Sequence, residues 1–215
     1  MSNLKPGVLL VHDGEGVGDW LTAIEQRFVA LGFELCVPTN LSDEKSGAFL
    51  PDRQVQALLE SSLASLGERE HVDADRLSVV GFGAGGTHAF LLGCASCNVA
   101  AIVNFESPLI YAELAANQPI QPLEMALNLS APLLAFFSDS NPELLESKQR
   151  LEVVGSQFAK DFDIVGHSGP SPADYRFLGA NEGSADQYSE FAQDAWRRII
   201  AFLREQLELS ELADL

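Results

Sequence analysis

Short apolar runs alternate along this chain with longer segments of helical period, and this alternation restricts its fold more than any other feature. A turn rich in Gly, Asn or Ser follows each run. This arrangement is typical of parallel strands joined by helices. Most of the runs are apolar throughout, as strands covered on both faces are. The sequence therefore predicts a doubly wound α/β domain with a mostly parallel sheet of six or seven strands.

The expected elements follow from these runs and from the residues that end them. The predicted strands are 7–12, 33–38, 77–82, 100–105, 133–138 and 175–179, with 162–167 as a weaker seventh. The predicted helices are 19–31, 52–66, 85–97, 142–160 and 186–207. Prolines at 108, 119 and 122 interrupt residues 107–130, which we expect to form an irregular, cap-like segment. We expect residues 1–215 to form a single domain.

The net charge of the chain restricts the classes of molecule that it can bind. With 31 acidic and 13 basic residues the net charge is −18, and so acidic a surface repels nucleic acid and anionic lipid. The longest apolar run is too short to span a bilayer, and the first residues lack a secretory signal, which predicts a cytoplasmic protein. Three cysteines do not make a disulfide framework in a chain of this length.

A glycine-dense turn at residues 81–86, read G-F-G-A-G-G, follows one predicted strand and precedes a helix. Two mechanisms use such a turn. In one, the middle residue of G-x-Nuc-x-G is a nucleophile, and here that residue is Gly83, which has no side chain. In the other, Gly81, Gly83 and Gly86 bind a dinucleotide pyrophosphate and Glu106 binds its ribose. Two strand–helix units precede this turn, whereas the dinucleotide fingerprint normally opens its fold.

Four separated stretches together resemble the dienelactone hydrolase family of α/β-hydrolases. They are GVLLVHDGEG at 7–16, VDADRL at 72–77, GFGAGG at 81–86 and AWRR at 195–198. The resemblance covers about residues 7 to 208. It implies an α/β-hydrolase core that acts on ester or lactone bonds. Because the chain has no room for the family's N-terminal antiparallel hairpin, we expect a smaller sheet that is parallel throughout.

The resemblance also implies where a catalytic triad would lie, and all three positions are substituted. The family's cysteine or serine nucleophile falls on Gly83. Its acid, in a G-x-x-D-P turn, falls on Asn141, and its histidine, in Y-P-G-A-x-H-G-F, falls on Glu182. Nucleophilic catalysis needs an attacking group, a base and a group that orients the base. We therefore predict that no catalytic residue is intact.

A pocket for a small molecule is still expected at these positions. The resemblance implies that the backbone N–H groups of Gly14 and Ala84 point into the former oxyanion site, beside the N-terminus of a helix. Asp13 would lie next to Gly83, with Glu182 opposite. Two carboxylates in one cleft would repel each other or would attract a cation. Neither has ligand spacing, so we predict neither a metal nor a cofactor.

Other residues offer alternatives. If residues 167–173 are not an insertion, His167 rather than Glu182 would reach the pocket, with Asp139 as its orienting acid. The nucleophile would then have to be Ser107 or Ser138. Separately, Cys94 and Cys97 have redox spacing, but they lie at the end of a predicted helix, where the helix dipole does not stabilise a thiolate, so we interpret them as structural.

These observations lead to three hypotheses. The first is a catalytically inactive relative of the family that binds a small ligand in the vestigial pocket or acts as an interaction subunit. The second is an ester or lactone hydrolase with a relocated nucleophile. The third is a dinucleotide binder through Gly81–Gly86. The sequence leaves the oligomeric state open.

Overall fold

The computed structural model describes residues 4–12, 18–43, 49–168, 178 and 189–209. Its strands are β1 (Lys5–Val11), β2 (Glu34–Cys36), β3 (Val72–Phe82), β4 (Ala101–Phe105), β5 (Leu133–Ser138) and β6 (Phe162–His167). Its helices are α1 (Asp19–Ala30), α2 (Asp52–Gly67), α3 (Ala84–Ala95), α4 (Pro142–Phe158) and α5 (Ser189–Gln206), with a 3₁₀ helix, η1 (Pro122–Asn128).

The six strands form one sheet in the order β2-β1-β3-β4-β5-β6, and each neighbouring pair is parallel. The prediction of a doubly wound parallel sheet is therefore confirmed, including the weaker strand at 162–167. The predicted strand at 175–179 lies outside the described residues except for Leu178, which is buried.

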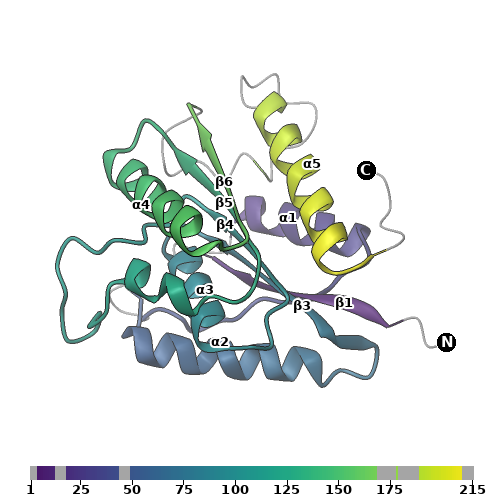
Figure 1. The fold of residues 1–215 in the computed structure, drawn as a ribbon. Helices are drawn as coiled ribbons and strands as arrows, with labels where there is room; N and C mark the ends of the chain where they lie inside the picture. The colour runs from purple at the N-terminus through teal and green to yellow at the C-terminus, as the bar shows by residue number, and fades with distance from the viewer. Residues whose placement is uncertain (1–3, 13–17, 44–48, 169–177, 179–188, 210–215) are drawn as a thin grey trace.

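Helices cover both faces of the sheet (Figure 1). Helices α1 and α5 lie on one face, and α2, α3 and α4 lie on the other. Strand β1 shows why its run is apolar throughout: Val8 and Leu10 pack toward α1 and α5, whereas Leu9 and Val11 pack toward α2 and α3. Alternate side chains of a strand point to opposite faces, so each needs an apolar residue.

Helix α3 packs very closely against the sheet because several of its contacts are made by glycines. A Cβ on Gly85 would collide with the carbonyl oxygen of His12, and one on Gly81 would collide with the backbone of Gly86. Nine of the twelve residues of α3 are buried. This helix is therefore fixed at its N-terminal end directly beside the ends of β1 and β3.

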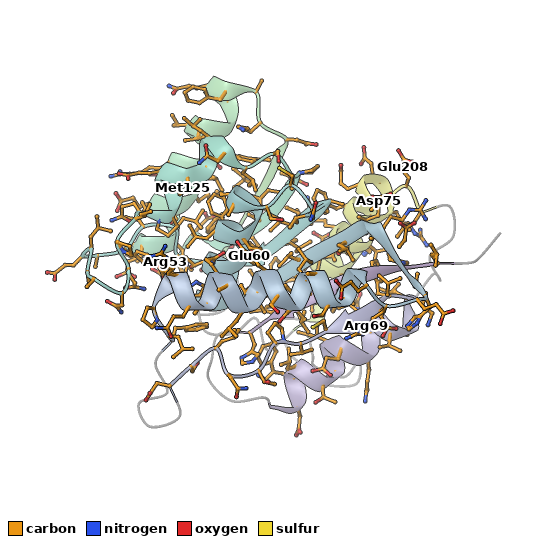
Figure 2. All side chains as sticks on the ribbon, turned by 90° about the horizontal axis from the view of Figure 1, so that it is seen from below. Arg53, Glu60, Arg69, Asp75, Met125 and Glu208 are labelled. Carbon is orange, nitrogen blue, oxygen red and sulfur yellow. The ribbon has the colours of Figure 1, made fainter. Side chains whose placement is uncertain are left out.

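The outer layer is more polar. In Figure 2, α2 crosses the front of the molecule with the exposed side chains of Arg53 and Glu60 along it. On the opposite face, Trp196 of α5 is buried and donates a hydrogen bond from Nε1 to the carbonyl oxygen of Leu178. No helix among the described residues is long and apolar enough to cross a membrane.

Candidate functional site

The carboxyl ends of β3 to β6 bring the candidate residues to one edge of the sheet. Backbone bonds continue the ladder past the strands: the N–H of Gly83 donates to Phe105 O at 2.8 Å, and that of Glu106 donates to Phe136 O at 3.0 Å. In α/β sheets, ligands bind outside this edge. The described candidates are therefore adjacent to one another at the place where such folds bind ligands.

Gly83 forms the sharp turn between β3 and α3. Its backbone has φ 52° and ψ −128°, a conformation that side chains rarely adopt. The strained strand-to-helix turn of a nucleophile elbow is thus present, as the sequence predicts. The residue at its apex is glycine, so the turn presents backbone where a nucleophile would stand.

Ala84 is the first residue of α3. The first N–H groups of a helix have no intrahelical acceptor, and the helix dipole makes this end partly positive. The N-terminus of α3 can therefore bind an acyl oxygen or an anion. Gly14, the other predicted donor, lies outside the described residues, as do Asp13 and Glu182.

A buried carboxylate–imidazole pair lies at the same edge. His167, the last residue of β6, has its Nε2 atom 2.5 Å from Oε1 of Glu106, which follows β4. The two side chains are only 7% and 3% exposed. The ring of His167 also packs on Phe191 of α5, with ring centroids 4.4 Å apart. An ionised carboxylate only accepts hydrogen bonds, so Nε2 of the imidazole donates to it.

The backbone of Glu106 is unusual. Its φ of 51° lies in the left-handed region, which few non-glycine residues adopt. Its second carboxylate oxygen, Oε2, is buried and has no hydrogen-bond partner among the described residues. Strained residues of this kind persist where the surrounding structure fixes them, and they concentrate at functional sites.

Asn141, which falls at the position of the family's triad acid, has a structural role. The side chain of Asn141 caps α4, accepting a hydrogen bond from the N–H of Glu143 at 2.9 Å. The expectation that Asp139 orients His167 is wrong, because the Asp139 carboxylate instead binds Lys148 Nζ at 2.8 Å. Among the described residues, Glu106 is the acid that contacts His167. Sequence reasoning had assigned Glu106 only to a ribose, and no local motif points to this pairing.

Neither candidate for a relocated nucleophile contacts an imidazole through its described hydrogen bonds. The Ser107 hydroxyl is fully buried and bonds to Phe105 O at 3.2 Å. The Ser138 hydroxyl bonds to that of Ser140 at 2.7 Å. These hydrogen bonds provide no activating base for either serine.

Packing accounts for the glycine spacing that resembles a dinucleotide fingerprint. A Cβ on Gly86 would collide with the Ser107 hydroxyl, and Gly81 touches Gly86. These glycines therefore bring β3, α3 and the end of β4 together. The carboxylate of Glu106, the predicted ribose ligand, is bound to His167 instead. Both observations weigh against the dinucleotide hypothesis.

A second polar cluster lies between α2, α3 and the segment after β4. Tyr111 Oη is 3.4 Å from both carboxylate oxygens of Asp52, and His88 Nδ1 is 3.9 Å from Asp52 Oδ1. Burial lowers the pKa of His88 to about 4 and raises the pKa of Asp52, the latter effect opposed by the Tyr111 hydrogen bond. His88 is thus neutral at pH 7, and the cluster fixes the predicted cap-like segment to the two helices.

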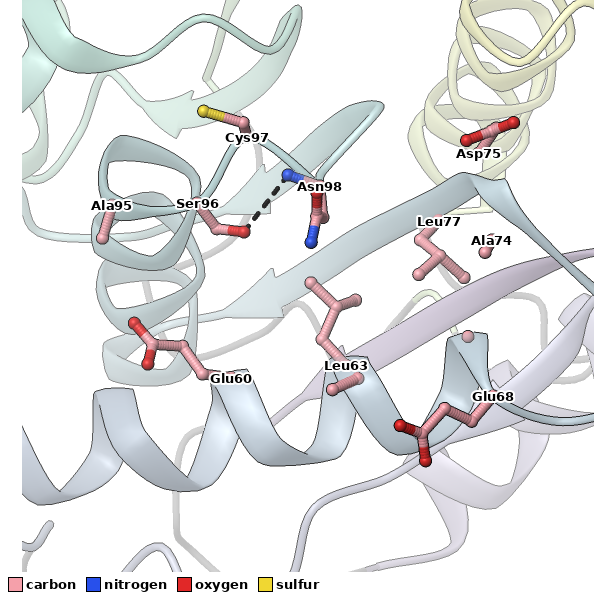
Figure 3. Close-up of a pocket in the computed structure, with 12 residues that line it drawn as sticks. Glu60, Leu63, Glu68, Ala74, Asp75, Leu77, Ala95, Ser96, Cys97 and Asn98 are labelled. Carbon is pink, nitrogen blue, oxygen red and sulfur yellow. Dashed lines mark hydrogen bonds between the residues drawn. The ribbon is translucent and has the colours of Figure 1, made fainter.

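Two grooves in the described surface lie away from the carboxyl edge. One, of about 610 Å³, lies between α2, the start of β3 and the end of α3 (Figure 3). Leu63 and Leu77 project into it, and Glu60 and Glu68 stand at its rim. The other is lined by α1 and β2. Among the described residues, no group of three His, Cys, Asp or Glu side chains could hold a metal.

A parallel sheet covered by helices, with a nucleophile-elbow turn at its carboxyl edge, defines a protein of the α/β-hydrolase class. The crystal structure named "Putative Dienelactone Hydrolase from Klebsiella pneumoniae" superposes with a TM-score of 0.80 at 21% identity, over 95% of this chain and 89% of its own. The structure of carboxylesterase Cest-2923 from Lactobacillus plantarum superposes with a TM-score of 0.69 at 15% identity, over 99% of this chain and 88% of its own.

The sequence comparisons define the family. The dienelactone hydrolase family model matches residues 2–207, and the chain belongs to this family. A probable 2-oxo-3-(5-oxofuran-2-ylidene)propanoate lactonase of Bradyrhizobium is 30% identical over 93% of this chain and 83% of its own length. The family membership expected from the four sequence stretches is therefore confirmed.

Proposed function

We propose that this chain binds a small carbonyl-bearing molecule at the carboxyl edge of its sheet and forms no covalent acyl-enzyme. The observation that carries the proposal is Gly83, which occupies the elbow conformation without an attacking atom. The N-terminus of α3 supplies donors for a carbonyl oxygen. Since the curated relative is described as a lactonase, a lactone or a similar small ester is the ligand class that we propose.

Labelling with a fluorophosphonate probe tests the absence of a nucleophile. We expect the native protein to remain unlabelled, because the apex of the elbow carries no attacking atom. Stoichiometric labelling of a native serine would overturn the proposal. Turnover of p-nitrophenyl acetate above a buffer-plus-albumin control would also overturn it if Glu106→Gln abolished that turnover.

Ligand-observed NMR with millimolar γ-butyrolactone tests binding. We expect saturation transfer from the native protein to the lactone, and its loss in Ala84→Pro. Proline removes the N–H of Ala84 but is well tolerated at the first position of a helix. The matched control is Ala84→Gly, which retains the N–H and should retain binding. Loss of binding in both variants, or in neither, would argue against the N-terminus of α3 as the site.

A hydrolase with a relocated nucleophile is the second candidate. The Glu106–His167 pair favours it, because an acid–histidine pair is one part of nucleophilic catalysis. The hydrogen bonds of Ser107 and Ser138 weigh against this candidate, because neither hydroxyl is bonded to an imidazole in them. Mass spectrometry of the fluorophosphonate-treated native protein separates the two candidates, since this second one requires a single modified serine.

A further inference from the structure

The second oxygen of the Glu106 carboxylate is the feature from which a further inference follows. We propose that Glu106 Oε2 recognises a hydroxyl or ammonium donor on the ligand, so that the site selects donor-bearing lactones or esters over those lacking a donor. This inference rests on the proposed function and specifies the ligand class for the same site.

The backbone conformation and the burial of Glu106 are both unfavourable. A non-glycine residue at φ 51° is strained, and a buried carboxylate needs hydrogen bonds to replace water. His167 satisfies only Oε1. Oε2 is buried, and no residue that the structure describes forms a hydrogen bond with it, which is less favourable than a satisfied group. A hydrogen-bond donor brought by a ligand would satisfy it.

Glu106 lies beside the elbow at the carboxyl edge of the sheet. The hydrogen bond from Gly83 N–H to Phe105 O places Glu106 on the strand next to the elbow, at the same edge of the sheet. Helix α3 begins at Ala84, and its first N–H groups are donors, whereas Glu106 Oε2 is an acceptor. One small molecule with an acyl oxygen and a donor can therefore match both groups.

The polarity of Glu106 Oε2 limits which ligand groups can bind to it. A carboxylate accepts hydrogen bonds and donates none, so a ligand ether or carboxylate oxygen facing Oε2 would be repelled. His167 holds the other oxygen and limits rotation of the carboxylate. We therefore expect the donor on the ligand, rather than its size, to determine binding at this position.

Four matched probes test this selectivity with the full chain: γ-butyrolactone and its α-hydroxy, α-methoxy and α-amino derivatives. Dissociation constants from ligand-observed NMR are expected to be about tenfold lower for the α-hydroxy lactone than for the α-methoxy lactone, since hydrogen bonds to charged groups are strong. The α-amino lactone distinguishes an ammonium donor from a hydroxyl. Equal affinities for the hydroxy and methoxy lactones would overturn the inference.

The Glu106→Gln variant provides a sharper readout. Its amide oxygen can accept from His167 Nε2, which leaves the NH₂ group at the position of Oε2. The preference should then reverse in favour of the α-methoxy lactone, an effect that a merely structural role would not produce. An unchanged hydroxyl preference would overturn the inference.

Two further variants keep the test decisive. Glu106→Gly suits the backbone at φ 51° and should fold, and it should bind the hydroxy and methoxy lactones equally. Asp139→Asn is the matched control, because this carboxylate lies at the same edge but is bound to Lys148, and the hydroxyl preference should survive. A hydroxyl preference that persists in Glu106→Gly would exclude Glu106 as its source.

Failure of the inference differs from failure of the proposed function. If native protein binds γ-butyrolactone without distinguishing the hydroxy and methoxy derivatives, the binding site stands and the role of Glu106 falls. If no lactone binds to native protein, the proposed function is wrong, and the inference that rests on it is wrong as well.

Discussion

Glu106 and His167 are 61 positions apart in the chain, yet Oε1 of one lies 2.5 Å from Nε2 of the other. The pair joins β4 to β6, which are separated in the sheet by β5. It replaces the contact that the sequence assigned to Asp139. The carboxyl edge therefore carries an acid–histidine pair beside an elbow whose apex is glycine.

Breaking this pair on one side should destabilise the fold. His167→Phe leaves the Glu106 carboxylate buried without its described partner, and we expect a loss of about 3–5 kcal/mol in the free energy of unfolding. Urea denaturation measures this loss. In a double-mutant cycle with Glu106→Gly, the double variant should lose clearly less than the sum of the single losses. Additive losses would show that the two side chains do not interact.

The close approach of α3 to β1 should make Gly85 intolerant of any side chain. Gly85→Ala places a methyl group against the carbonyl oxygen of His12, which is backbone and cannot rotate away. We expect a loss of several kcal/mol, or failure to express as folded protein, as is common for overpacking against rigid groups. Gly155→Ala is the control, since its methyl meets Phe162 Cδ2 at 3.2 Å, a side chain that can shift. Equal losses would contradict the close packing described for α3.

Stability should depend on pH through His88. Burial lowers its pKa from 6.5 to about 4 in the folded chain, so only the unfolded chain binds a proton between these values. The folded state therefore loses stability as the pH falls from about 6.5 to 4, by up to roughly 3 kcal/mol. The raised pKa of Asp52 acts in the opposite direction, because above its ordinary value of 3.8 the folded chain holds a proton that the unfolded chain has released. Urea unfolding at several pH values measures the slope.

The variant His88→Leu isolates this effect. Leucine cannot titrate, so the difference in unfolding free energy between native protein and variant should shrink as the pH is lowered from 7 to 4. His71→Leu is the control: His71 is exposed and forms an ion pair with Glu34. A constant difference between native protein and His88→Leu would refute a depressed pKa at His88.

The three cysteines should react very differently with thiol reagents. Cys97 is exposed, whereas burial raises the pKa of the Cys94 thiol to about 12 and also raises that of Cys36. We expect one rapid equivalent with Ellman's reagent at pH 8, because the thiolate is the reactive form. Cys97→Ser should abolish it and Cys94→Ser should not. Rapid reaction of two thiols would favour a redox pair at 94 and 97.

The sequence predicted the elements well because their signals are local. Strands β5 and β6 begin and end at the predicted residues, and α1, α2 and α4 begin at the predicted ones. Strand β3 begins earlier than predicted, at Val72. The prediction missed its first residues because they are polar and lack the apolar signal of a strand covered on both faces. The elbow at Gly83 was also predictable, since glycine spacing is a property of consecutive residues.

The site was only partly predictable. Asn141 was aligned with a triad acid, whereas its position before Pro142 makes it the cap of α4. Asp139 was expected near His167, and its backbone N–H does donate to His167 O, but its side chain turns to Lys148. Which carboxylate reaches an imidazole depends on side-chain directions that a strand pattern does not contain.

The amino-acid sequence by itself thus determined the order of strands and helices along the chain, the α/β class and the glycine at the apex of the elbow, because each depends on residues adjacent in the chain. Only the tertiary structure decided that Glu106 contacts His167 and that Oε2 is buried without a hydrogen-bond partner in the described part of the chain. That contact requires β4, β5 and β6 to stand side by side and Glu106 to adopt a left-handed backbone, and long-range packing alone sets both conditions.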